Sequence, residues 1–87
     1  MTTPSQQAGV RVCVLVPTYN NCATIGDVVR QAQAIVPDVI VVDDGSTDGA
    51  ADVLAKIDGI TVITHERNRG KGFALANGME RAAEMGF

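Results

Sequence analysis

The chain of 87 residues has room for one small domain, near the lower size limit at which a single hydrophobic core is stable. Hydrophobic residues make up 46% and charged residues 20% of the chain, a balance typical of globular proteins that argues against disorder. The net charge of −3 argues against a general nucleic-acid binder, and no apolar run approaches the roughly 20 residues that span a bilayer.

The first part of the chain predicts a tail, a strand and a helix. Residues 1–9 are polar and lack the apolar segment of a secretory signal, so we expect a flexible tail. Residues 10–16 are β-branched and almost continuously apolar, which predicts a central parallel strand that Pro17 ends. Residues 24–36 place apolar side chains at helical spacing, with Thr24 as a candidate N-cap, and Pro37 ends this helix.

The remainder of the chain repeats the alternation of strand and helix. Residues 39–42 and 60–64 are short apolar runs that predict two further strands. Residues 50–57 predict a short helix between them. Residues 73–85 predict a third helix, with a buried face that includes Leu75, Gly78, Met79, Ala82 and Met85, and Gly86–Phe87 predicts a Schellman ending.

The order β-α-β-α-β-α predicts an α/β fold of Rossmann-like type. Such alternation gives right-handed crossovers and a parallel sheet between two helical layers. The order stops after a helix, so we expect residues 10–87 to be the N-terminal part of a larger domain. The open sheet edges of such a piece can be hidden by self-association. Cys13 and Cys22 fit neither a CxxC motif nor a disulfide scaffold, so we expect reduced thiols and a cytoplasmic protein.

Three polar loops follow the predicted strands: a first loop (residues 17–23), a second loop (residues 43–49) and a third loop (residues 65–72). Ligands of open parallel sheets bind beyond the carboxyl ends of the strands, where these loops meet. In the first loop, the ring of Tyr19 can stack on a nucleobase or simply cap the edge of the core. In the second, Asp43 and Asp44 point to different sides, so one can enter the crevice while the other holds the turn. The alternative is an ordinary turn that caps the next helix.

The third loop combines cations with glycines at the start of a helix. Arg67, Arg69 and Lys71 lie within five residues, and glycines flank Lys71. A helix N-terminus with these residues is suited to a phosphate group, although a solvated basic loop would have the same composition. His65 has no second metal ligand at a suitable spacing, so a structural or surface role is expected.

Other sites that bind phosphate or metal do not match this sequence. There is no GxxxxGK[ST] motif, and the Gly70–Leu75 segment lacks the third glycine of a dinucleotide fingerprint. The segment 44–49 begins like an EF-hand loop, but Ala55 stands where the bidentate glutamate should be. A dehalogenase-type phosphatase would need Asp-x-Asp at a strand end, whereas the carboxylates here are adjacent.

Taken together, the three loops resemble family 2 glycosyltransferases with the GT-A fold. The matching blocks are Val16-Pro17-Thr18-Tyr19-Asn20, Val41 to Gly49 and Asn68 to Gly72, with Ala74, Ala76, Gly78 and Ala82. The resemblance covers residues 10–87, and the third block looks most like the branch of polyprenyl- and dolichyl-phosphate sugar synthases. It implies that this chain is the N-terminal, nucleotide-binding half of a GT-A domain and that the donor is a nucleotide-diphosphate sugar.

The resemblance also implies which residues bind the nucleotide: Pro17, Tyr19, Asn21, Val42, Asp44 and Lys71. Pro17 and Tyr19 match positions that line the base, and Val42 and Asp44 match positions beside base and ribose. Lys71 matches a position that can neutralise negative charge near the donor. Asn21 stands where the lipid-phosphate branch often has a glutamate.

The rest of the reaction is expected to lie outside these residues. The family's Asp-x-Asp motif, which holds a divalent Mg or Mn ion, belongs to the next strand, and the acceptor site and catalytic base lie further on. We therefore expect no catalytic residue and no metal ligand in residues 1–87, and no sugar transfer by this chain alone. The acceptor can be a lipid phosphate, in which case the longer protein contacts the inner face of a membrane.

Two other functions are considered. A non-catalytic nucleotide-binding module would have the same loops, and the segment that follows residue 87 would distinguish it from a transferase. A GT-A-like nucleotidyltransferase would carry a glycine-rich, basic loop after the first strand, and residues 17–23 contain neither glycine nor a basic residue.

Overall fold

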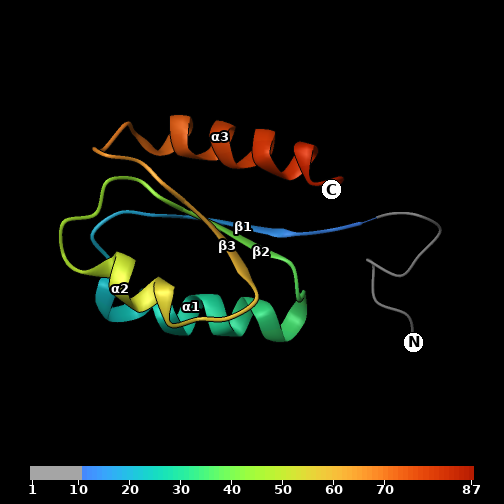
Figure 1. The fold of residues 1–87 in the computed structure, drawn as a ribbon, viewed down its shortest axis with the longest axis horizontal. Coiled ribbons are helices and arrows are strands. Elements are labelled where there is room, and N and C mark those ends of the chain that lie inside the picture. Colours follow the sequence, from blue (N-terminus) through green and yellow to red (C-terminus); the bar gives the residue numbers. More distant parts are fainter. Residues whose placement is uncertain (1–10) are drawn as a thin grey trace.

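A computed structural model describes residues 11–87 as three strands that alternate with three helices (Figure 1). The predicted tail and the predicted strand start at Val10 lie outside the described residues. The elements are β1 (Val14–Thr18), α1 (Cys22–Ile35), β2 (Val39–Asp43), α2 (Ala50–Ala55), β3 (Ile60–Thr64) and α3 (Lys71–Glu84). The predicted β-α-β-α-β-α order is confirmed.

The three strands form one parallel sheet in the order β1-β2-β3. In register, Val16 of β1 pairs with Val41 of β2, and Val41 pairs with Val62 of β3. Helix α3 covers one face, while α1 and α2 cover the other (Figure 1). The predicted three-layer, Rossmann-like α/β arrangement is therefore confirmed, and all three strands direct their carboxyl ends toward the same edge of the sheet.

Among residues 11–87 the central strand is β2, and the first strand, which we expected to be central, lies at an edge of the sheet that these residues form. All five residues of β2 are buried, whereas β1 is an edge strand whose residues are mostly half-buried. Strand β1 also continues through Pro17, which we had expected to end it. The carbonyl of Thr18 accepts the N–H of Asp44 at 2.8 Å, so Thr18 turns its backbone toward β2. The preceding Pro17 therefore turns its nitrogen to the open edge, where no ladder donor is needed.

Helices α1 and α3 each begin two residues before the predicted start. Helix α1 begins at Cys22 instead of Thr24, because the backbone N–H of Cys22 finds an acceptor in Asp48 Oδ2 at 2.9 Å, far away in sequence. Helix α3 begins at Lys71 instead of Phe73. Its predicted Schellman ending is confirmed: Gly86 has a φ of +91°, and the N–H of Phe87 donates to the carbonyl of Ala82 at 2.9 Å. Within residues 11–87, no helix combines the length and apolarity required to cross a bilayer.

Helix α3 packs on the sheet through its smallest residues. Ala74 and Gly78 are buried, while Met79, which we had placed on the buried face, is 62% exposed. A Cβ atom at Gly78 would collide with the side chain of Leu15 and lie 3.0 Å from Val42 Cγ2. The close approach of α3 to β1 and β2 therefore depends on the absence of a side chain in glycine at position 78. A hydrophobicity pattern does not detect this requirement.

Gly78→Ala is expected to destabilise the fold, although alanine normally favours a helix. The gain in helix propensity is about 1 kcal/mol, and overpacking against Leu15 and Val42 costs about 1–3 kcal/mol, so we expect a net loss near 1 kcal/mol. Gly72→Ala is the matched control, because no atom lies within 4 Å of its Cβ position in the same helix. Urea unfolding should show Gly72→Ala to be as stable as the wild type or more so. A stabilised Gly78→Ala would contradict the packing described here.

Candidate functional site

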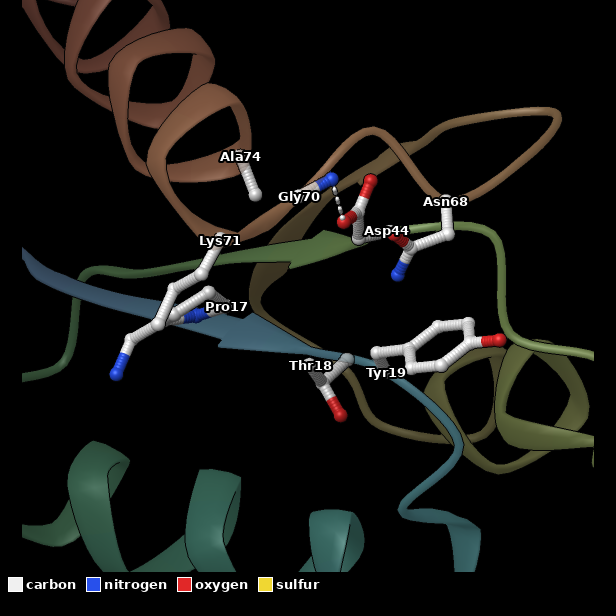
Figure 2. A pocket seen from close by; sticks show the side chains of 8 residues that line it. All are labelled: Pro17, Thr18, Tyr19, Asp44, Asn68, Gly70, Lys71 and Ala74. Atoms are coloured by element: carbon white, nitrogen blue, oxygen red, sulfur yellow. Dashed lines mark hydrogen bonds between the residues drawn. The ribbon is translucent and has the colours of Figure 1, made fainter.

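A hollow of about 360 Å³, here called the rim hollow, lies between the end of β1 and the start of α3 (Figure 2). It is lined by Pro17, Thr18, Tyr19, Asp44, Asn68, Gly70, Lys71 and Ala74. Four of the six residues predicted to bind the nucleotide, namely Pro17, Tyr19, Asp44 and Lys71, thus meet around one space. They converge because the carboxyl ends of β1 and β2 and the loop after β3 reach the same edge of the sheet.

The other two predicted residues lie outside this lining. Asn21 is exposed at the start of α1, where its carbonyl accepts the N–H of Ile25 at 2.9 Å. Val42 is wholly buried, and its side chain lies beneath α3 next to Gly78. The rim hollow therefore brings together four of the six predicted residues, and the predicted contacts of Asn21 and Val42 with the nucleotide stay predictions.

Asp44 is the most strongly bonded side chain of the rim hollow. Its Oδ1 accepts the backbone N–H of Arg69 and lies 2.8 Å from His65 Nδ1, and its Oδ2 accepts the N–H of Gly70 at 2.9 Å (Figure 2). The hydrogen bond with His65, aided by those from Arg69 and Gly70, holds the pKa of Asp44 below its ordinary value of 3.8 despite the opposing effect of burial. Asp44 is therefore an ionised carboxylate that ties the third loop to the end of β2.

Asp43 is the carboxylate of the Asp43–Asp44 pair that holds the turn. Its side chain is only 1% exposed, and its Oδ1 accepts the N–H of Ser46 at 3.1 Å. This bond closes the turn at the start of the second loop. Because neighbouring side chains of a strand point to opposite sides, Asp43 holds the turn while Asp44 faces the third loop and the rim hollow.

The first and second loops are joined by side chains that the sequence analysis did not single out as partners. The backbone N–H of Asn20 donates to Ser46 Oγ at 2.9 Å, and Asn20 Oδ1 accepts the N–H of Thr47 at 2.8 Å. Asp48 accepts the N–H of Cys22 through Oδ2 and the N–H of Ala50, at 3.2 Å, through Oδ1. One carboxylate therefore satisfies the N-termini of both α1 and α2, which positions the first loop beside the second.

Asp48→Asn is expected to lower stability at neutral pH and to flatten the acid dependence of stability. The N–H of Cys22 is the largest of the contacts that hold the pKa of Asp48 below 3.8. The stabilisation by the ionised carboxylate of Asp48 is therefore complete above about pH 4. It is lost as the pH falls further, because the carboxyl of Asp48 takes up a proton at a higher pH in the unfolded chain than in the folded one. Urea unfolding at about pH 7 and pH 3 measures this. The control is Asp52→Asn, which removes an exposed carboxylate from the first turn of α2. Its stability should fall with decreasing pH as that of the wild type does, and an Asp48→Asn stability curve parallel to the wild-type curve would refute the expectation.

The cations of the third loop do not form one cluster. Lys71 lines the rim hollow and extends past Pro17 (Figure 2). The guanidinium of Arg69 lies over the ring of Phe73, 4.6 Å from its centre, and the backbone of Arg67 packs against Gly45. Of the three predicted cations, Lys71 is the one that borders the hollow, together with the N-terminus of the 14-residue helix α3.

Residues 11–87 do not offer a ligand set for a divalent metal. In this part of the chain no three His, Cys, Asp or Glu side chains are grouped closely enough to hold an ion. Both oxygens of Asp44 already accept hydrogen bonds, and the side chain that contacts its carboxylate is an imidazole, not a second carboxylate.

The sequence matches a protein-family model and is similar to three curated proteins. The glycosyl transferase family 2 model matches residues 13–84. Glycosyltransferase AglJ of Haloferax volcanii is 40% identical over 79% of this chain and 22% of its own length. An uncharacterized protein of Methanocaldococcus jannaschii is 36% identical over 82% of this chain and 29% of its own. The UDP-N-acetylglucosamine–dolichyl-phosphate N-acetylglucosaminyltransferase of Methanococcus voltae is 28% identical over 86% of this chain and 37% of its own.

The chain spans between about a fifth and two fifths of the length of these relatives. No solved structure shows a significant match. The family match covers all three strands in full, and it includes the three loops that follow them and border the rim hollow. This chain belongs to glycosyl transferase family 2.

Proposed function

We propose that residues 11–87 bind the nucleotide of a nucleotide-diphosphate sugar in the rim hollow and form the nucleotide-binding part of a glycosyltransferase. The observation that carries this proposal is the meeting of an aromatic ring, a carboxylate and an amine around one space: Tyr19, Asp44 and Lys71. These three groups come from three different loops, and they match the three chemical parts of the ligand.

Each part of a nucleotide has a suitable partner in the hollow. The ring of Tyr19 is 50% exposed, so one face is free to stack on a base. The carboxylate of Asp44 can accept a hydrogen bond from a base N–H or a ribose hydroxyl. Lys71 and the N-terminus of α3 provide positive charge for a diphosphate. A volume of about 360 Å³ falls within the usual range for small-molecule sites.

The remaining parts of the reaction belong to the same proposal for the longer protein. One relative is named for transfer to dolichyl phosphate, which supports a lipid phosphate as the acceptor and a place in the lipid-phosphate branch of the family. A divalent Mg or Mn ion, its Asp-x-Asp ligands and the catalytic base would lie in further segments. Cys13 and Cys22 are free thiols, in keeping with a cytoplasmic protein that works at the inner face of a membrane.

Calorimetric titration with UDP and GDP, with and without Mn²⁺, tests the proposal. We expect one of the two nucleotides to bind, with weaker binding in Tyr19→Ala. Met79→Ala removes another exposed large side chain, from the outer side of α3, and should bind as the wild type does. If neither nucleotide binds, the proposed function is wrong. If this chain alone transfers sugar, the proposal that catalysis needs segments beyond these residues is wrong.

We also propose that this chain self-associates in isolation. Strands β1 and β3 are both edges of the sheet, and Val62 of β3 is 39% exposed. Unpaired strand edges with apolar side chains favour pairing with another chain. Sedimentation over a range of concentrations measures the oligomeric state, and a monomer throughout that range would contradict the proposal.

A further inference from the structure

His65 and Asn77 do not line the rim hollow, and both border a second space instead. The backbone N–H of His65 donates to the carbonyl of Asp43 at 2.9 Å and so continues the ladder between β3 and β2. The side chain of His65 is 9% exposed and borders a second space with Arg69 and Phe73. His65 thus contacts the carboxylate of the hollow without lining the hollow itself.

The two ring nitrogens of His65 have different partners. Nδ1 lies 2.8 Å from Asp44 Oδ1, and Nε2 lies 2.8 Å from Asn77 Nδ2. An amide nitrogen can only donate, so Nε2 is an unprotonated acceptor, and the proton of the neutral ring is on Nδ1. The imidazole therefore donates to Asp44 because Asn77 fixes its tautomer.

This arrangement leaves the two oxygens of Asp44 in different states. Oδ1 accepts two hydrogen bonds, from His65 and from the N–H of Arg69. Oδ2 accepts one, from the N–H of Gly70, and a carboxylate oxygen has room for a second donor. The bond from His65 saturates Oδ1 and orients the carboxylate so that Oδ2 is the oxygen left to accept a bond from a ligand.

We propose that His65 is a positioning residue: its Nδ1–H fixes the Asp44 carboxylate, and with it the backbone of Arg69 and Gly70, in the arrangement that faces the rim hollow. The link to nucleotide binding rests on the proposed function above. The alternative is that the ring only fills space, since its edge packs on Phe73 with ring centres 5.3 Å apart. A pair of amide substitutions separates these two roles.

His65→Asn and His65→Gln each keep one half of the imidazole. The amide of asparagine superposes on the position of Nδ1 and can still donate to Asp44. The longer glutamine places its amide near the position of Nε2 and can reach Asn77 but not Asp44. Both changes remove the packing on Phe73, so a ring that only fills space predicts the same effect for both.

Three measurements on the whole chain test the inference. In the ligand-free wild type, ¹⁵N NMR of the imidazole should show Nδ1 protonated and Nε2 unprotonated, and the reverse tautomer would overturn the inference. The amide resonances of Arg69 and Gly70 should stay near their wild-type positions in His65→Asn and move in His65→Gln. Equal movement in both variants would overturn it as well.

Nucleotide affinity provides the third measurement. With UDP or GDP, whichever binds the wild type, His65→Asn should stay close to wild type and His65→Gln should bind about tenfold more weakly, the effect of one hydrogen bond to a charged group. Equal affinities would overturn the inference. A wild type that binds neither nucleotide would contradict the proposed function instead, and the tautomer and the two amide resonances would still decide whether His65 positions Asp44.

Discussion

Gly45→Ala is expected to lower the free energy of unfolding by about 3 kcal/mol. Gly45 has a φ of +79°, and a side chain there costs about 1–2 kcal/mol. A Cβ atom would also collide with the backbone of Arg67 and Asn68, and would lie 2.7 Å from Arg67 Cα. Overpacking of this kind costs about 1–3 kcal/mol, and here the obstacle is a main chain that cannot rotate away as a side chain would.

Gly49→Ala is the matched control for this prediction. Gly49 lies in the same loop with a φ of +91°, but no atom lies within 4 Å of its Cβ position. It should therefore show only the backbone cost of about 1–2 kcal/mol. Thermal unfolding measures both, and for a chain of this size about 3 kcal/mol corresponds to a fall in Tm of roughly 15 °C. If the two variants were equally stable, the close contact between the second and third loops would be refuted.

The contact at Gly45 has a consequence for the site as well as for stability. It brings the backbone of Arg67–Asn68 against the second loop, and the next residues along the chain, Arg69 and Gly70, reach Asp44. The glycine therefore allows the carboxylate and the start of α3 to meet. Gly45→Ala should disturb the amide resonances of Arg69 and Gly70 even where the protein remains folded, whereas Gly49→Ala should leave them in place.

Local sequence patterns were enough to predict the order of the elements and which residues would meet at the carboxyl ends of the strands. Strand β3 has the predicted bounds, and β2 exceeds its prediction by Asp43 alone, because short β-branched runs bounded by polar loops leave little choice. The meeting of Tyr19, Asp44 and Lys71 was predictable for a different reason. Parallel strands send their following loops to one edge, so the strand assignments already place these residues together.

What could not be predicted depends on contacts between residues far apart in the chain. Asp48 caps a helix that begins 26 positions earlier, and Asp44 bonds to N–H groups 25 and 26 positions later. Met79 and Ala74 are both compatible with the helical period, and the approach of α3 to β1 decides that the smaller residue is buried. Pro17 stays in β1 because β1 is an edge strand, which depends on the strand order and not on the local residues.

Asp44→Asn is expected to weaken binding of UDP or GDP by about 10- to 100-fold, the effect of losing a hydrogen bond to a charged group. Whichever way the new amide is turned, its nitrogen would face a donor: the N–H of Arg69, the N–H of Gly70 or the imidazole of His65. The variant therefore loses an acceptor for the ligand and loosens the loop that carries Lys71. Calorimetry measures the affinity, and circular dichroism confirms that the variant is folded.

The nature of the ligand allows a sharper test of the role of Asp44. If Asp44 binds the nucleoside, Asp44→Asn should weaken UDP or GDP by a larger factor than it weakens inorganic diphosphate, because diphosphate lacks the nucleoside that Asp44 contacts. Lys71→Met should weaken UDP, GDP and inorganic diphosphate by similar factors, because all three carry the diphosphate that Lys71 contacts. Glu84→Gln makes the same change of charge as Asp44→Asn but at the other end of α3, about 20 Å along the helix, where salt screens its effect on the hollow. If folded Asp44→Asn binds nucleotide as the wild type does, Asp44 serves only to tie the third loop to the end of β2, and the ligand of the rim hollow must be held by other groups.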